Sequence, residues 1–523
     1  MSGIDLSEAL AAEAEGRFLE GFGMVHAVLA QTPQDPDALN LLGRLCLGGG
    51  DLVSAISLQR LVLQLVPEHV RAGADLAAAL AAAPDPTGGA EAFAAACAIE
   101  PEIALHHRIP SSLAPFARIG DVRALLETAV RCDPGLAAAH AALGNLFVRE
   151  DRGVEALAAY RRAAGLDPHD AAAQLAAAEI AHVLGDAASG DRHRAAALAL
   201  QRVYAEPVGV PDARLRVLVL HAPAPWTAQV SLDLVADRTR LVLHRLYLDG
   251  EDERIPALPE YDVVFNAIGI TEGARPAIAA AQRFIADQTK PAFNAPHALL
   301  RTARPALPGA LRGVEGCVVA AATRRSRAEL RDLARDAAQV DGLAFPLVVR
   351  PVDAHGGVGL KRVGDGRELE RYIADADAEN FDLSRYIEYR DADGWYRKYR
   401  VVLVDGRPHA YHLAFAASWI VHYQTGATRD HRWMQAEEER FLGEPQTVFP
   451  AWPPVFSSIA AALGLDYVGL DCARLPDGRV LVFEADPASW VHAHDASAAP
   501  YRAAAVEGIS RALTQMLERR SGR

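Results

Sequence analysis

The hydrophobic positions of the first two hundred residues recur with the period of an α-helix. Residues 1–205 are rich in alanine, and their apolar residues do not alternate with polar ones as they do in a half-buried strand. Prolines punctuate this pattern every 33 or 34 residues, at Pro33, Pro67, Pro101, Pro134 and Pro168. We therefore expect residues 1–205 to be all-α and to consist of helix pairs that each end near a proline.

Small and large residues also repeat in a constant order within these pairs. One pair carries Leu143, Gly144, Phe147, Ala156, Tyr160 and Ala163, and an earlier pair carries Leu42, Gly43, Cys46 and Ala55. This order and its period resemble the tetratricopeptide repeat. The resemblance implies a solenoid of five repeats with one or two capping helices, and a concave groove that can recruit a peptide or protein partner. The stretch 103–136 is the least regular of the five.

A different pattern begins after a linker at 206–213, which contains two prolines and a glycine. The apolar runs LRVLVL and YDVVFNAIG are typical of buried parallel strands, and a helical run follows the second. This alternation predicts a small parallel α/β domain over 214–300. Because ligands bind at the carboxyl ends of such strands, Asn266 and Asn294 are candidate substrate residues. The alternative is that both are ordinary turn residues.

Near the C-terminus, the segment GLDYVGLDCARLPDGRVLVFEADP reads as a strand, a tight turn and a second strand. The hairpin brings Asp471 close to Glu484 and Asp486, which share one face of the second strand. Clustered carboxylates repel one another unless a cation lies between them. Oxygen-only ligands suit Mg²⁺, which usually also holds substrate phosphates. The sequence therefore predicts a magnesium site at these three residues.

A glycine-rich loop lies about 120 residues upstream, in FPLVVRPVDAHGGVGLKRV. An apolar strand ends at Arg350, and Gly356, Gly357 and Gly359 would let the backbone approach a ligand and offer N–H donors to phosphate oxygens. Arg350 would meet the same phosphates as a fixed cation. No Gly-Lys-Ser/Thr follows, so the loop is not a P-loop, and a strand follows where the dinucleotide fingerprint needs a helix. A plain hairpin turn is the alternative interpretation.

Together the loop and the hairpin resemble the ATP-grasp carboxylate–amine ligases, over roughly residues 214–520. The resemblance implies that 214–300 is a pre-ATP-grasp α/β domain. It also implies that 301–383 and 384–523 are the two lobes of an α+β ATP-grasp fold that binds ATP and Mg²⁺. The metal ligands would be Asp471, Glu484 and Asp486, with aspartate at the third position where the family has asparagine.

The resemblance also assigns nucleotide-binding residues. The segment 384–388 is similar to the strand that contacts adenine through its backbone, and Arg350 and Arg400 take the places of catalytic residues that face the phosphates. The residues implied to bind the nucleotide are Arg301, Arg350, His355, Gly356, Gly357, Gly359, Tyr386, Ile387 and Glu388. The family has lysines where this chain has Arg301 and Arg350. Arginine keeps the charge and binds phosphate well, but the substitutions leave open a nucleotide binder without activity.

The activity implied by the resemblance is an ADP-forming ligation (class EC 6.3). A substrate carboxylate takes the γ-phosphoryl group of ATP, and an amine then displaces phosphate from the acyl phosphate to form an amide. Residues that follow the metal ligands, and the strand after Gly406, would line the substrate end. Candidate substrate residues there are His412, His422, Ser489 and His492. The alternative is an ordinary amphipathic hairpin, and the acid and the amine cannot be named from the sequence.

A second class of function stays open, in which the repeats act as an adaptor and the remainder binds nucleotide without turnover. Between these two lies a ligase whose repeats capture a peptide or protein that it then modifies.

Composition limits which binding partners and which cellular compartment are expected for this chain. About half of the 523 residues are hydrophobic, which argues against disorder. The net charge of −14 argues against a nucleic-acid surface. The five cysteines are scattered and lack a CxxC pair, which favours reduced thiols and a cytoplasmic location. We expect no secretory signal, because the first thirty residues carry several acids and no basic n-region. We also expect no membrane span, because no apolar run free of charge reaches about twenty residues.

Overall fold

In the computed structural model the chain divides into two compact units, Met1–Gln201 and Arg202–Arg523. The described residues are 6–14, 16–67, 69, 71–73, 75–76, 79, 126–127, 130, 134–135, 137–205, 214–225, 228–250, 255–336, 343–352, 354, 357–421, 431–491 and 500–522. The third and fourth predicted repeats, which include the irregular stretch 103–136, therefore lie largely outside the described residues.

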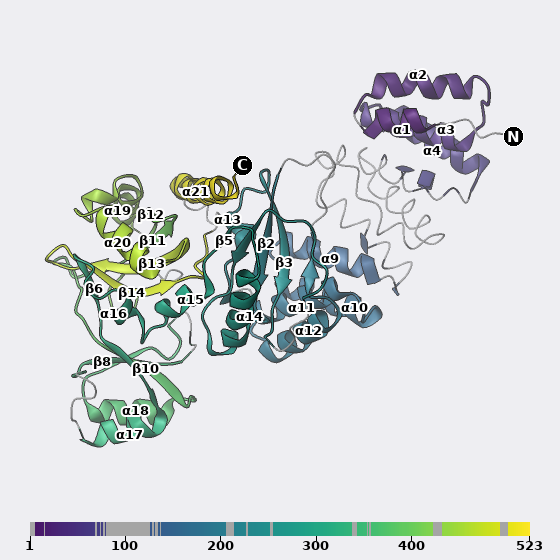
Figure 1. Ribbon diagram of the computed structural model, residues 1–523. Helices are drawn as coiled ribbons and strands as arrows, with labels where there is room; N and C mark the ends of the chain where they lie inside the picture. Colours follow the sequence, from purple (N-terminus) through teal and green to yellow (C-terminus); the bar gives the residue numbers. More distant parts are fainter. Residues whose placement is uncertain are drawn as a thin grey trace. The chain divides into compact units, whose positions relative to one another are not determined.

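The first unit is helical, as the sequence predicted (Figure 1). Its described helices are α1 (Ser7–Ala14), α2 (Phe18–Leu29), α3 (Pro36–Gly48), α4 (Leu52–Leu65), α9 (Ala137–Arg149), α10 (Gly153–Leu166), α11 (Ala171–Val183) and α12 (Ala187–Leu200). The glycines of the repeat pattern lie where two helices pack closely against each other. A Cβ atom at Gly144 would lie 2.5 Å from the ring of Tyr160, and one at Gly43 would lie 2.5 Å from the side chain of Gln59. Glycine therefore lets α9 approach α10, and α3 approach α4.

The second unit opens with a five-stranded sheet of order β1-β3-β2-β4-β5 (Figure 1). Its strands are β1 (Val203–Tyr204), β2 (Leu215–His221), β3 (Leu241–Tyr247), β4 (Val263–Asn266) and β5 (Ala292–Phe293). All neighbours pair in parallel except β1, which pairs antiparallel with β3. The predicted parallel α/β domain is therefore present, and β1 extends it into the region that the sequence assigned to the repeats.

Helices cover both faces of this sheet. Leu218 and Leu220 of β2 pack in one core with α14 (Arg275–Ala286). Val217 and Val219, which point the other way, pack in a second core with α21 (Ala503–Ser521). Such burial on both faces explains why β2 reads as a continuous apolar run and not as an alternating one.

A second sheet forms what we call the first lobe. Its strands run in the order β7-β10-β8-β9, with every neighbouring pair antiparallel. They are β7 (Ala322–Ser326), β8 (Leu347–Pro351), β9 (Lys361–Val363) and β10 (Asn380–Arg385). Helices α17 (Arg327–Asp336) and α18 (Gly366–Asp375) share one apolar core with this sheet, and Figure 1 shows them side by side next to β8 and β10.

The third sheet forms the second lobe, in the order β12-β11-β13-β14-β6. Its strands are β6 (Cys317–Val319), β11 (Tyr396–Val404), β12 (Arg407–Ala416), β13 (Tyr467–Arg474) and β14 (Val480–Asp486), and the helices α19 (Arg432–Gly443) and α20 (Pro454–Leu463) pack against it. The hairpin β13–β14 is the one that the sequence predicted. In contrast, β6 belongs to the segment assigned to the first lobe, yet it pairs in parallel with β14.

Several short helices complete the second unit. They are α13 (Leu232–Val235), η2 (Glu272–Ala274), α15 (Pro296–Leu299), η3 (Leu300–Thr302), α16 (Leu307–Ala310), η5 (Pro445–Thr447) and η6 (Pro500–Arg502). Among the described residues, every helix is too short or too polar to cross a bilayer.

Candidate functional site

The register of the second-lobe sheet aligns a row of charged side chains. Arg400 on β11 is the partner of Asp471 on β13, and Asp471 is in turn the partner of Glu484 on β14. Asp486 lies two residues beyond Glu484 on the same strand. Directly opposed residues of an antiparallel pair share a face, as do residues two apart on a strand. The three carboxylates named from the sequence therefore stand on one face, beside Arg400.

Two cations hold the carboxylate of Asp471. Arg400 donates to it through Nε, at 2.6 Å from Oδ1, and through Nη2, at 3.0 Å from Oδ2. The Nζ of Lys398 lies 3.0 Å from the same Oδ2. Burial alone would raise the pKa of Asp471, but the positive charges of Arg400 and Lys398 outweigh it and hold that pKa well below its usual value. Asp471 is therefore an anion although it is buried.

The carboxylates of Glu484 and Asp486 differ in the charges that lie near them, and therefore in the direction in which their pKa values shift. Arg304 donates through Nη2 to Oε2 of Glu484 at 2.6 Å. Burial would raise the pKa of Glu484, but Arg304 reverses that effect and lowers it. Asp486 accepts from the backbone N–H of Ala488 at 2.9 Å. Burial, followed by the negative charge of Glu484, raises the pKa of Asp486 to about 6.

The oxygen donors in this row are of the kind that magnesium prefers. However, within the described ranges no three His, Cys, Asp or Glu side chains converge on one point as metal ligands do. The reason is visible in the contacts, since Asp471 and Glu484 direct their oxygens at arginine and lysine. The donor chemistry fits a magnesium ion, and the site would have to exchange these cations for it.

A cavity of about 290 Å³ lies between the sheets of the two lobes. One end, where ion pairs join Arg304 to Glu484 and both Lys398 and Arg400 to Asp471, contains four cations and two carboxylates, and a fifth cation, Arg385, also lines the cavity. The four cations and two carboxylates of this charged end are Arg304, Arg350, Lys398, Arg400, Asp471 and Glu484. The other end is mostly apolar and is lined by Val319, Val348, Tyr386, Ile387, Trp419, Ile420, Val421, Leu481 and Phe483, among others. A ligand that fills the whole cavity therefore needs a flat or apolar part and an anionic part.

The predicted adenine segment borders the apolar end. Tyr386 and Ile387 both line the cavity, and the rings of Tyr386 and Trp419 meet edge to face with centroids 5.7 Å apart. The guanidinium carbon of Arg362 also lies over the ring of Tyr386, 4.7 Å from the ring centroid. Glu388 is not a lining residue. Its carboxylate accepts instead from the backbone N–H groups of Tyr389 and Arg390, both at 3.0 Å.

The end of the glycine loop reaches the charged end of the cavity. Gly357 lines it and has φ +77°, and Gly359 follows with φ +66°, a backbone conformation that favours glycine. The guanidinium of Arg350 donates to the carbonyl of Ala354. Burial, with the nearby charge of Arg304, lowers the pKa of Arg350 to about 10. His355 and Gly356, the other residues predicted here, lie outside the described residues.

Arg301 and Arg304 are only three residues apart in the sequence, but their side chains contact different parts of the second unit. The guanidinium of Arg301 donates to the carbonyls of Ala462 and Leu463, at 3.3 and 3.2 Å, and so caps the C-terminus of α20. It is not a lining residue of the cavity, whereas Arg304 is. Sequence reasoning missed Arg304, and only its closeness to Arg301 could have suggested it.

Lys398 was also missed. It is two residues from Arg400 on β11, so the strand period of two places both on the cavity face. That spacing was available from the sequence once Arg400 had been chosen.

The candidate substrate residues of the α/β domain are buried in hydrogen-bonded packing. Asn294, at φ +56°, accepts from the backbone N–H groups of Asp466 and Tyr467 and donates to the carbonyl of Tyr467. Asn266 donates to the carbonyl of Asn294 at 2.9 Å. Both side chains are fully buried and neither lines the two cavities that border Glu484.

Of the later candidates, His412 and Ser489 are also buried and outside both cavities. His412 is the register partner of Arg400, and its Nδ1 lies 3.6 Å from Glu438 Oε1. The pKa of His412 is lowered, by burial and then by the charge of Arg502. Ser489 is packed against Gly469, where a Cβ atom would lie 2.2 Å from its Oγ. His422 and His492 fall outside the described residues.

A second cavity, of about 450 Å³, also borders the row of carboxylates. It shares Arg304 and Glu484 with the first cavity and also contains Asp486. Its remaining lining comes from several segments of the second unit, including Glu272 in η2 and Arg324 on β7. Because both cavities meet at Glu484, a group held in the second would lie next to the charged end of the first.

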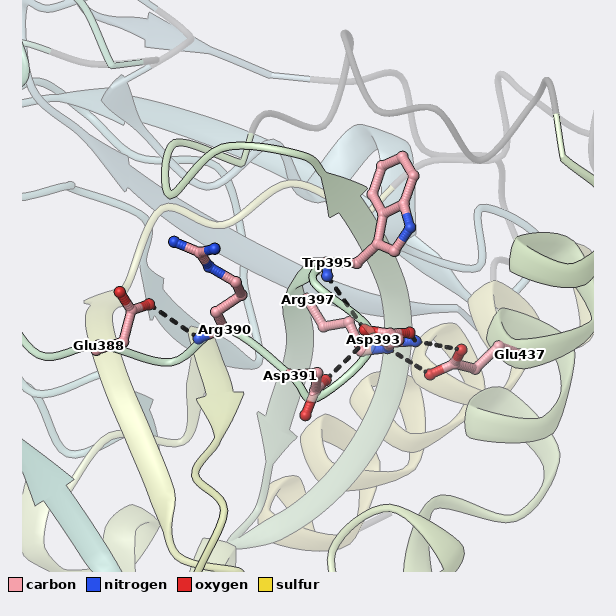
Figure 2. Close-up of polar contacts among 7 residues, drawn as sticks. All are labelled: Glu388, Arg390, Asp391, Asp393, Trp395, Arg397 and Glu437. Carbon is pink, nitrogen blue, oxygen red and sulfur yellow. Dashed lines mark hydrogen bonds and ion pairs between the residues drawn. The ribbon is translucent and has the colours of Figure 1, made fainter.

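On the face of β11 opposite to Arg400, Arg397 fixes the segment that follows the predicted adenine segment 384–388 (Figure 2). Its guanidinium donates five hydrogen bonds of 2.7–3.0 Å to the carboxylates of Asp391, Asp393 and Glu437. Figure 2 shows the three acids around it, with Asp393 also accepting from the backbone N–H of Trp395. Arg397 thereby ties the loop 388–395 to α19 and holds one border of the apolar end in place.

Comparison with protein-family models found no match, and comparison with curated proteins found none either. Solved structures similar to the C-terminal part include ATP-grasp ligases. The VanG D-Ala:D-Ser ligase from Enterococcus faecalis is 13% identical, with 59% of this chain and 99% of that chain covered and a TM-score of 0.37. The ATP-grasp ligase PsnB, complexed with minimal precursor, Mg and ADP, is 12% identical, with coverages of 59% and 98% and a TM-score of 0.35.

The N-terminal part is similar to MamA, at 16% identity and a TM-score of 0.23, with 38% of this chain and 96% of that chain covered. At scores of this size, none of these likenesses decides the function, which rests on the cavity and its residues.

Proposed function

We propose that this protein is an ATP- and magnesium-dependent ligase that joins a carboxylate to an amine and forms ADP and phosphate. The observation that carries the proposal is the two-ended cavity, apolar beside Tyr386 and Ile387 and charged beside Arg350 and Asp471. Adenine suits the apolar end and a triphosphate suits the cationic end. The volume of this cavity, about 290 Å³, lies at the small end of the range for ligand sites.

In this proposal the cations of the charged end hold phosphate oxygens. Arg350 is suited to that task because its Nε is buried and has no hydrogen-bond partner among the described residues, so a ligand could satisfy it. Arg400 and Arg304 would contribute further positive charge, and the glycine loop at 354–359 would cover the phosphates. Asp471, Glu484 and Asp486 would hold the magnesium ion, which when bound supplies charge neutralisation at the phosphates.

The second cavity would hold the carboxylate substrate. Its border with the first cavity at Arg304 and Glu484 would place a carboxylate oxygen near the γ-phosphorus. That oxygen bonds to phosphorus while the bond to the β-phosphate oxygen breaks, and ADP leaves. The amine nitrogen then bonds to the acyl carbon, phosphate leaves, and the nitrogen gives up a proton. Arg304 stabilises the negative charge that both steps spread over phosphate oxygens.

In this proposal the helical repeats recruit a peptide or protein partner for the ligase. The α/β domain is proposed to support the substrate side through Asn266 and Asn294, acting as structural residues that join it to β13. The second candidate function is an adaptor that binds nucleotide without turnover. Arginine at both positions where the resemblance expects lysine is the observation that favours it.

The test is release of ADP and phosphate from ATP in the presence of Mg²⁺, with carboxylates and amines supplied in a pairwise grid that includes short peptides. We expect turnover for at least one pair and its loss in Glu484→Gln. Glu444→Gln, at an exposed position after α19, is the matched control and keeps activity. Calorimetric binding of ADP to both variants separates the alternatives. Binding without turnover for any pair supports the adaptor, and absence of nucleotide binding contradicts both functions.

A further inference from the structure

Lysine is rare in this chain. The sequence contains three lysines, Lys290, Lys361 and Lys398, among 53 basic residues. Of these three, Lys398 alone lines the cavity between the lobes. It stands at the charged end, on the face of β11 that also carries Arg400, and its side chain is 19% exposed. Lys398 is thus one flexible ammonium group among the planar guanidinium groups of four arginines that also line the cavity.

The contacts of Asp471 distinguish Lys398 from its neighbour. Arg400 makes two hydrogen bonds to the carboxylate and occupies both oxygens, whereas Lys398 makes one contact, to Oδ2. If Lys398 leaves, Asp471 still has the bidentate partner that offsets its burial. If Arg400 leaves, Oδ1 loses its hydrogen bond inside the protein. Lys398 is therefore the cation whose departure costs less.

We propose that Lys398 is an exchangeable counter-ion, which pairs with Asp471 in the nucleotide-free protein and moves to a nucleotide phosphate when a divalent cation takes its place. This inference rests on the proposed function and assigns one cation of the charged end, Lys398, a role that changes when ligands bind. A divalent ion at Oδ2 and an ammonium at 3.0 Å from the same oxygen would repel each other. The flexible stem of lysine lets Nζ turn within the cavity, where Arg350 already marks the phosphate end.

The exchange predicts opposite effects of one substitution on two ligands. In Lys398→Met, which keeps most of the apolar stem, the ammonium no longer competes for Asp471. Binding of Mn²⁺, which takes the same oxygen ligands as Mg²⁺, should become roughly threefold to tenfold tighter in the nucleotide-free protein. Binding of ADP without metal should become weaker by a similar factor, because a phosphate contact is lost. Electron paramagnetic resonance measures free Mn²⁺, and calorimetry measures ADP.

Two further variants complete the test. Lys398→Arg keeps the charge and should bind both ligands within about twofold of the unmodified protein. Arg335→Met removes the same charge from an exposed position on α17, where the side chain is 71% exposed, and should change neither affinity. Lys398→Gln is the second neutral variant, used if Lys398→Met unfolds at a lower temperature than the unmodified protein.

The outcomes separate this inference from the proposed function. Tighter Mn²⁺ binding together with weaker ADP binding supports the exchange. Weaker binding of both ligands, or no change in either, overturns it while leaving the proposed function standing, because the unmodified protein still binds nucleotide and metal. If the unmodified protein binds neither Mn²⁺ nor ADP, the proposed function fails and the exchange fails with it.

Discussion

Arg400 and Asp471 face each other across β11 and β13, and two hydrogen bonds of 2.6 and 3.0 Å join the guanidinium to the carboxylate. With Lys398 on the same carboxylate, the acid carries two cationic partners before any ligand is bound. The lobe therefore contains its own counter-charges for the carboxylate row. Binding of a metal ion and a nucleotide would change the partners within these ion pairs. The charged side chains that such ligands need are already present in the lobe.

The Asp471 pair should stabilise the second lobe. In Asp471→Asn, Arg400 and Lys398 lose the charge that offsets their partial burial, so the free energy of unfolding should fall by about 3 kcal/mol. Denaturant unfolding measures the loss. Asp477→Asn, in the exposed turn between β13 and β14, is the control and should change stability by less than about 0.5 kcal/mol. Equal stability of the two variants would show that the pair contributes nothing.

The Arg397 contacts predict that arginine is required at this position. Arg397→Met leaves Asp391, Asp393 and Glu437 without their shared cation, and the free energy of unfolding should fall by about 3 kcal/mol. Arg397→Lys should recover little, because one ammonium cannot make five directed hydrogen bonds. Arg440→Met, at an exposed position of α19, is the control. Full stability in Arg397→Lys would argue that charge alone matters.

Asn294 should be structural and not a substrate contact. In Asn294→Ala, two backbone N–H groups and one carbonyl lose their partner, and alanine must adopt φ +56°. We expect a loss of about 3 kcal/mol in unfolding free energy. The affinity for ADP should stay within about twofold at a temperature where the variant is folded. A stable Asn294→Ala protein that binds ADP but loses turnover would instead favour the substrate role.

His221 should make stability depend on pH in mildly acidic solution. Burial, followed by the charge of Arg245, lowers its pKa to about 4, and Asp233 opposes this only in part. Between that value and its unfolded pKa of about 6.5, the unfolded chain binds the proton more readily, so stability falls as the pH falls. The loss attributable to His221 should reach about 3 kcal/mol at pH 4.

Unfolding measured from pH 7 to pH 4 in His221→Gln checks this prediction. The variant should lose less stability over this range than the unmodified protein, whatever its stability at pH 7. His297→Gln, at an exposed position, should leave the profile unchanged. Parallel profiles for the His221 variant and the unmodified protein would mean that the imidazole is not held neutral by the fold.

The carboxylate row shows how far local pattern reaches. Asp471, Glu484 and Asp486 could be grouped from the sequence because a tight turn and a strand period of two decide which side chains meet in a hairpin. The helical character of the first unit followed equally from its period. In both cases the deciding residues lie close together along the chain.

Arg301 and Arg304 show what local sequence patterns could not predict. Both are arginines in one short segment, and the sequence favoured Arg301. The end of α20, whose last residue Leu463 is 162 residues away, accepts hydrogen bonds from Arg301, and Arg304 is the arginine that contacts Glu484. The same holds for Lys398. Its contact with Asp471 depends on the pairing of β11 with β13, whose partner residues lie about 70 residues apart in the sequence.

By itself the sequence determined the two classes of architecture and the identity of the acidic row, because periodicity, turn chemistry and spacing are local properties of a chain. Only the tertiary structure decided which cations face those acids and that Asn266 and Asn294 join strands instead of lining a cavity. Those outcomes depend on how buried hydrogen-bonding groups from distant segments satisfy one another, and no local pattern encodes that choice.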